Sequence, residues 1–198
     1  MSAGEPSSRL AGLAGRAWSM LVRPRATWEI IAAEPADPRA LFLAYVAPLA
    51  AVGPICGAMG LQVFGASIAG IHLKLGLGGT VLAAAANYGL GLLAVYLLAM
   101  AVSALAPAFG GQADLRRALN LVAFSATGFW VSGLFALYPT LGFPAAMLGG
   151  LCSLYALFRG LQPLMRPPPD RTLTYYAGVL ACGLALTLIL RLVAARVG

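Results

Sequence analysis

The sequence predicts an all-α protein: a polytopic membrane helix bundle of five transmembrane helices, preceded by amino-terminal amphipathic interfacial helices. Of the 198 residues, 61% are hydrophobic and only 10% are charged, whereas soluble domains carry roughly 25% charged residues. The apolar residues gather in five blocks without strand-like alternation, each long enough for the roughly 20 helical residues that cross a bilayer. We therefore expect a cytoplasmic amphipathic segment over residues 1–37 and a membrane domain over residues 38–198.

The first element is expected to be an amphipathic helix over residues 7–22. Leucines, alanines and Trp18 recur on one face at steps of three and four, while Arg9, Arg16 and Arg23 recur every seven residues on the other. An apolar stripe opposite an arginine stripe, with a tryptophan at the boundary, is typical of a helix lying among lipid headgroups. The pattern also fits a helix packed on the cytoplasmic ends of its own bundle, and both arrangements remain open.

The next stretch, LVRPRATWEIIAAEPADPRALFLAY (residues 21–45), predicts a collar at the inner membrane surface. Pro24 suits the first turn of a short helix, and Trp28 supplies much of that helix's apolar face. Glu34 ends the helix because it precedes a proline. Asp37 is then a good N-cap for the first transmembrane helix, which begins at the following proline.

Five apolar blocks are predicted to cross the membrane as helices, near residues 39–65, 79–106, 117–138, 142–165 and 173–195. Proline- and glycine-containing breaks, PAFGGQADLRR, YPTLGF and RPPPDR, end the second, third and fourth blocks. Residues 66–78 are ambiguous, since they are apolar enough to extend a neighbouring helix or to lie along the surface. Pro48 and Pro54 should kink the first helix.

Small residues recur inside the blocks, and in lipid such faces favour close helix packing. We expect these faces to meet other helices, either within the bundle or in a homo-oligomer. They comprise Gly53, Gly57 and Gly60 in the first block, Ala83, Asn87 and Gly91 in the second, and Gly149 and Ser153 in the fourth.

The loop after the second block carries the remaining candidate residues, Phe109, Gly110, Gly111, Asp114, Arg116 and Arg117. It lacks the GxxxxGK[ST] spacing that cradles phosphate, so we interpret it as a turn in which Asp114 caps the third helix. Because opposite charges lie at one depth on one side, we expect Glu29 or Glu34 to pair with Arg116 or Arg117 and hold the amino-terminal helices onto the bundle.

Basic residues predict the orientation. A cytoplasmic amino terminus places ten of them inside and three outside, with the carboxyl terminus outside. The inside set is Arg9, Arg16, Arg23, Arg25, Arg39, Arg116, Arg117, Arg159, Arg166 and Arg171, and the outside set is Lys74, Arg191 and Arg196. Because these residues are scattered singly beside apolar blocks, we expect contacts with lipid, including anionic lipid, and no nucleic acid.

Several motifs in this order resemble the bacterial branch of the Yip1 family: RPRATWEIIAAEP, LFLAYVAPLAAVGPI, ALAPAFGG, ALNLVAFSATGFWVSGLFALYPTLGF and GLQPLMRPPPDRTLTYY. The resemblance runs from about residue 16 to the end. It implies five spans, a cytoplasmic amino terminus and a bacterial cytoplasmic (inner) membrane. Related chains commonly carry a proline where Gly128 stands, so the resemblance implies a softened helix kink here.

No catalytic constellation is visible, and we expect no enzyme activity, cofactor or metal. A transporter or membrane enzyme usually shows ionisable residues inside the bilayer, yet all six acidic residues fall outside the five blocks. His72 is the only histidine, and the three cysteines stand alone, as small core residues. Ser125 and Ser132 lack a histidine or lysine base in the spans, so interhelical hydrogen bonding is their expected role.

Two functions from different classes remain. The first is a non-enzymatic multi-pass protein that organises the membrane or scaffolds partners, namely further copies of itself or other membrane proteins. Eukaryotic Yip1 relatives are associated with vesicle traffic and lipid-modified Rab GTPases, and only membrane organisation or partner binding carries over to a bacterial chain. The alternative is a small passive transporter or channel formed by an oligomer, with polar residues such as Asn87 lining the path.

Overall fold

Helices account for nearly all of the computed structural model, which describes residues 6–34, 37–68, 71–73 and 76–197. The amino-terminal elements are α1 (Pro6–Val22), α2 (Pro24–Ala33), α3 (Pro38–Leu41), the π-helical turn η1 (Phe42–Val46) and α4 (Ala47–Phe64). After two short strands follow α5 (Leu77–Leu105), the 3₁₀ turn η2 (Ala106–Phe109), α6 (Leu115–Ser125), α7 (Thr127–Ser132), η3 (Gly133–Leu137), α8 (Pro139–Met165) and α9 (Thr172–Val197).

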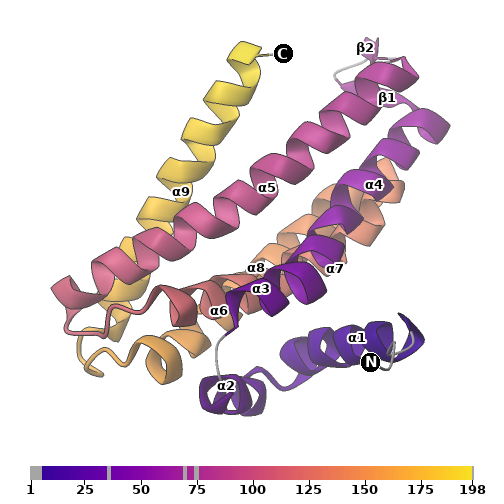
Figure 1. Cartoon of the computed structure of the whole chain (residues 1–198). Helices are drawn as coiled ribbons and strands as arrows, with labels where there is room; N and C mark the ends of the chain where they lie inside the picture. Colours follow the sequence, from indigo (N-terminus) through magenta and orange to yellow (C-terminus); the bar gives the residue numbers. More distant parts are fainter. Residues whose placement is uncertain (1–5, 35–36, 69–70, 74–75, 198) are drawn as a thin grey trace.

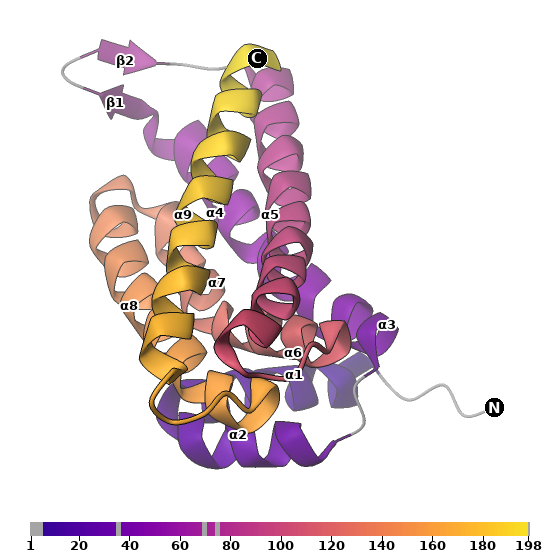
Figure 2. The same ribbon diagram turned by 90° about the vertical axis from the view of Figure 1, so that its left-hand side faces the viewer.

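Five helical stretches are long and apolar enough to cross a membrane, as the sequence predicts. They are Pro38–Phe64, Leu77–Phe109, Leu115–Leu137, Thr140–Met165 and Thr172–Leu192. In Figures 1 and 2, α1 and α2 lie across one end of the bundle, whereas the strands and the last turns of α9 lie at the opposite end. The predicted all-α, five-span bundle is thereby confirmed.

The ambiguous segment between the first two spans is a small hairpin rather than a helix extension. Strands β1 (Ala66–Ile68) and β2 (Ile71–Leu73) pair antiparallel, with Ala66 opposite Leu73. Gly65 ends α4 with a φ of +70°, a backbone conformation that glycine adopts without a steric cost. The chain therefore leaves the helix sharply and turns back toward α5.

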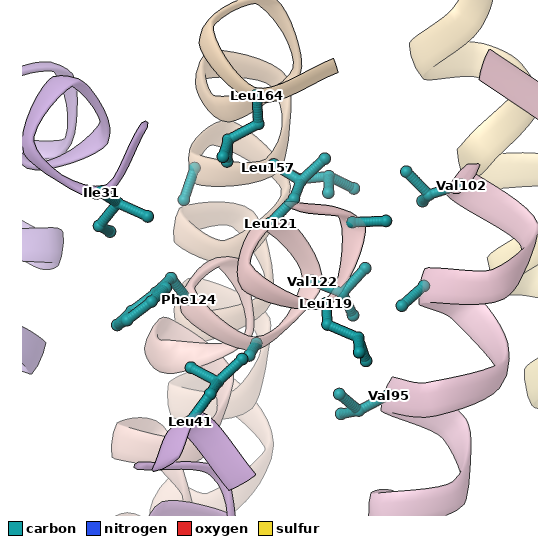
Figure 3. Packing of buried hydrophobic residues seen from close by; sticks show 14 of the residues in the cluster. Ile31, Leu41, Val95, Val102, Leu119, Leu121, Val122, Phe124, Leu157 and Leu164 are labelled. Carbon is teal, nitrogen blue, oxygen red and sulfur yellow. The ribbon is translucent and has the colours of Figure 1, made fainter. Parts of the chain in front are cut away.

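The third span lies at the centre of the bundle. Of its most apolar window 67% is buried, against 28% or less for the other four spans. In Figure 3, Leu121 of α6 lies near Leu157 of α8, while Val95 and Val102 project from α5. The apolar core thus forms around α6, with α5 and α8 on different sides of it.

The third span is also broken, although the sequence predicts one continuous helix. Helix α6 stops at Ser125, α7 begins at Thr127, and a 3₁₀ turn follows Ser132. The Thr127 hydroxyl donates to the Phe124 carbonyl at 2.6 Å, and this kind of back-bonding bends helices. The helix is therefore interrupted at Ala126, two residues before Gly128 and without a proline.

The small-residue faces of the first and fourth blocks pack against the third span, which is the arrangement expected for helix packing within the bundle. Gly53 of α4 faces Gly133 so closely that a Cβ on Gly133 would lie 2.7 Å from the Gly53 Cα. Gly149 of α8 lies against the Gly128 carbonyl in the same way. The face of the second block differs, because Asn87 is exposed on α5.

Candidate functional site

Helix α2 is fixed to the bundle by its tryptophan. Trp28 is 1% exposed, and its indole N–H donates to the Ala156 carbonyl of α8 at 3.0 Å. Its ring meets Phe124 of α6 edge-on, with 6.4 Å between ring centroids. Ile31, one turn later, is buried on the same face. The predicted apolar face of this helix is therefore the face that packs.

The predicted helix boundaries of the collar are also confirmed. Pro24 is the first residue of α2, and Glu34 is its C-cap with an extended ψ of 144°, which the following proline favours. The Asp37 Oδ1 atom accepts from the backbone N–H groups of Arg39 and Ala40 at the start of α3. Local signals alone place these elements, because each acts within one helical turn.

The ion pair that ties the collar together differs from the one we expect. Arg16 of α1 donates to the Glu34 Oε1 atom at 3.0 Å, and Arg117 contacts Asp114 of its own helix at 3.4 Å. The expected bridge from Glu29 or Glu34 to the arginines of α6 is therefore wrong. Helix α1 lies alongside α2, so Arg16 of α1 pairs with Glu34 in place of an arginine of α6.

Helix α1 packs on the bundle by a face slightly different from the predicted one. Ala17 is buried, as expected, and so is Met20 at 2% exposure, which the predicted apolar stripe does not include. Trp18 is 69% exposed, and the side chain of Arg9 lies outside the part that the structure describes. The helix therefore contacts its own bundle while Trp18 projects away from it.

The loop before α6 is a packed turn. Phe109 stacks on Tyr175 of α9 with 5.3 Å between ring centroids. Gly110 adopts a φ of +75°, and a Cβ on Gly111 would lie 2.9 Å from the Met165 carbonyl oxygen. Asp114 then caps α6, as predicted, by accepting from the backbone N–H groups of the next turn at 2.9 and 3.2 Å. These residues join the two loops at the collar end of the bundle.

A groove of about 600 Å³ lies between α1, the end of α2, the start of the first span and α6. We call it the collar groove. Its lining comprises Gly12, Arg16, Ile31, Glu34, Asp37, Ala40, Leu41, Leu43, Ala44, Tyr45, Pro48, Asn120 and Phe124. A smaller hollow of about 280 Å³ adjoins it across Ile31, Glu34 and Asn120, and Asp114, Arg116 and Arg117 lie in its wall.

Sequence reasoning singles out Arg16, Glu34 and Asp37 in this groove, but misses Tyr45 and Asn120. The Tyr45 hydroxyl lies 2.7 Å from the Thr127 hydroxyl at the helix break. Asn120 is 7% exposed. One signal in the sequence is the polar asparagine in the middle of the apolar run ALNLVAF, which becomes the most buried helix of the bundle.

The described residues show no arrangement typical of a catalytic centre. Ser125 is buried without a hydrogen-bond partner for its hydroxyl among them, and no basic side chain adjoins it in the spans. They include no group of three metal-binding side chains. Cys152 is exposed, so the expectation that all three cysteines are core residues is wrong. Asn87 lies exposed on α5, apart from the buried hydroxyls of α6 and α7.

Most of the chain matches a known family of sequences. The Yip1 domain matches residues 18–190 of the chain. The chain belongs to the Yip1 family. Searches of curated proteins and of solved structures found no match. The Yip1 domain begins at Trp18 in α1 and ends in the final span, so the collar groove is built almost wholly from residues within it.

Proposed function

We propose that this Yip1-domain protein organises the membrane or scaffolds partner proteins without enzymatic activity. Its place is the cytoplasmic membrane of a bacterium, with the collar inside and the carboxyl terminus outside. Multi-pass architecture and family membership support the general role. The partners are the lipid bilayer and either a second copy of the chain or another membrane protein.

The observation that carries this proposal is the exposure of Asn87. It lies ten residues into α5, about 15 Å along the helix and therefore within the hydrocarbon layer. No residue that the structure describes hydrogen-bonds its carboxamide. A polar group facing lipid is costly, and a neighbouring helix that pairs with it relieves this cost. A second copy is the simplest partner, because its own Asn87 offers a matching donor and acceptor.

The charged surface at the collar end supports the proposed orientation. Seven described arginines there are exposed, from α1, the collar, the loop before α6 and the loop before α9: Arg16, Arg23, Arg25, Arg39, Arg116, Arg166 and Arg171. Basic residues flanking spans favour the cytoplasmic side and attract its anionic lipids. Trp18 projects from the same end and suits the headgroup region.

The test measures association of the full chain in liposomes. Copies labelled with donor and acceptor dyes are reconstituted at several protein densities, and energy transfer reports their association. We expect Asn87→Leu to weaken association roughly three- to twentyfold, the range of one interhelical hydrogen bond. Thr187→Val is the matched control, since the Thr187 hydroxyl on α9 already donates to its own helix at Gly183.

Vesicle shape, imaged in the same samples, reports the second part of the proposal. If the Asn87→Leu variant associates as strongly as the wild type, the contact between copies lies on another face of the bundle. Wild-type protein that stays monomeric, leaves vesicles unchanged and retains no native partner in mild detergent would overturn the proposal.

A further inference from the structure

The collar groove changes character with depth. Asp37, at the start of α3, marks one end, and Pro48, in the first turn of α4, marks the other. Pro48 lies eleven residues after Asp37, which is about 16 Å along a helix. Charged side chains line the shallow end, whereas Leu41, Tyr45 and Phe124 line the deeper part. A phospholipid has the same order of polarity, with a charged headgroup above apolar chains.

Several polar atoms in the groove can form further hydrogen bonds with a ligand. Asn120 is more than nine-tenths buried, lines the groove, and makes no hydrogen bond to any residue that the structure describes. Among the described residues only the Ser125 hydroxyl is both fully buried and unpartnered, so the Asn120 carboxamide is accessible from the groove, where a ligand can form a hydrogen bond with it. The Glu34 Oε1 and Asp37 Oδ1 atoms accept hydrogen bonds from described residues. The second carboxylate oxygen of each residue can therefore accept from a ligand.

One turn of the helix beside the groove is a π-helical turn, which is wider than an α-helical one. Residues 42–46 form a π-helical turn in which the Ala47 N–H donates to the Phe42 carbonyl. Pro48 favours this turn, because it has no N–H to donate to Ala44 one turn earlier. Single π-turns occur often at functional sites. Here the turn carries Ala44 and Tyr45, which both line the groove.

The charged side chains of the groove indicate which lipid headgroup fits it. The groove and the adjoining hollow together contain three arginines and three carboxylates: Arg16, Arg116, Arg117, Glu34, Asp37 and Asp114. The three positive and three negative side chains balance, so an anionic lipid would add a negative charge that no side chain of this set neutralises. A quaternary ammonium has no N–H to donate to the free carboxylate oxygens. A headgroup with a phosphate and a primary ammonium satisfies both signs.

We propose that the collar groove binds one phospholipid whose headgroup carries a phosphate and a primary ammonium, as in phosphatidylethanolamine. Arg16 binds the phosphate, Glu34 and Asp37 accept from the ammonium, and Asn120 donates to the glycerol ester region. One acyl chain lies along Leu41, Tyr45 and Phe124. This inference goes beyond the proposed function, since the groove holds its lipid whether or not copies associate through α5.

The test is native mass spectrometry of the full chain released from a mild detergent. The delipidated protein is titrated with phosphatidylethanolamine, phosphatidylglycerol and phosphatidylcholine of identical acyl chains. We expect the first bound lipid to be phosphatidylethanolamine, with an apparent affinity about tenfold higher than for the other two, as one or two charged hydrogen bonds provide. Equal affinity for the three would show non-selective surface lipid only and would overturn the proposal.

Two pairs of variants locate the site. Asp37→Ser removes the carboxylate but keeps a good N-cap, and should abolish the preference, whereas Asp170→Ser, on an exposed acid outside the groove, should retain it. Ala44→Phe fills the groove and should reduce binding of the first lipid about tenfold, while Ala85→Phe, on the exposed face of α5, should not. A preference that survives both groove variants would place the lipid elsewhere and refute the assignment.

Discussion

The indole of Trp28 and the carbonyl of Ala156 are joined by a 3.0 Å hydrogen bond across 128 residues of sequence. The carbonyl belongs to α8, so this contact fixes a helix outside the spans to the fourth span. Gly160, one turn further along α8, has no side chain, and the indole of Trp28 occupies the space where a side chain would lie. A Cβ on Gly160 would lie 2.6 Å from the Trp28 Cε2 atom and 2.5 Å from the Leu121 Cδ1 atom.

We expect Gly160→Ala to expel Trp28 and release α2 from the bundle. Overpacking of this kind costs roughly 1–3 kcal/mol, and the hydrogen bond to Ala156 is lost with it. Limited proteolysis of the purified protein should cut near residues 22–36 faster than in the wild type, as it should in Trp28→Ala. Gly150→Ala is the control on the same helix, because nothing lies within 4 Å of its added Cβ. Unchanged proteolysis of Gly160→Ala would contradict this account of the collar.

The crossing of the first and third spans gives an asymmetric prediction. A Cβ on Gly133 would lie 2.7 Å from the Gly53 Cα and 2.9 Å from the Gly53 nitrogen, whereas a Cβ on Gly53 would lie 3.8 Å from the Gly133 Cα. Backbone atoms cannot move aside like a side chain. We therefore expect Gly133→Ala to lower the free energy of unfolding by roughly 1–3 kcal/mol and Gly53→Ala to have little effect. Titration with SDS in mixed micelles measures both, and equal losses would show that the helices shift apart.

The sequence predicts the features that depend on near neighbours. The ends of α2 and the caps at Asp37 and Asp114 follow from residues within one turn. The five spans follow from block length and composition. These predictions succeed because hydrophobicity and capping act locally.

Features that depend on how separate helices meet could not be predicted in this way. The ion pair of Arg16 with Glu34 requires α1 to lie along α2. The break at Thr127 depends on a hydroxyl that bonds its own backbone while also contacting Tyr45, 82 residues away. The collar groove exists only because α1 and α6 approach the same face of the first span. Periodicity in one segment carries no information about such partners.

Capping of α6 provides a prediction that separates two roles of one carboxylate. Asp114 accepts from two backbone N–H groups and also contacts Arg117 in a half-exposed ion pair. Asp114→Ala should lower the free energy of unfolding by about 1 kcal/mol through loss of the cap, while Asp114→Asn should stay near the wild-type value, since exposed ion pairs contribute little. The same SDS titration compares them. A loss in Asp114→Asn as large as in Asp114→Ala would assign the effect to the ion pair.

The proposed orientation can be tested with single cysteines at the two ends of the bundle. In a background with Cys56, Cys152 and Cys182 replaced by alanine, Gln112→Cys lies in the loop beside the collar and Gly76→Cys lies just before α5 at the hairpin end, both at exposed positions. Because basic residues concentrate at the collar end, a membrane-impermeant maleimide added to intact spheroplasts should label Gly76→Cys and reach Gln112→Cys only after permeabilisation. The opposite pattern would place the collar outside the cell and remove the basis for its contact with the inner leaflet. Labelling of both positions in intact spheroplasts would mean that the chain inserts in both directions, which the uneven distribution of its arginines argues against.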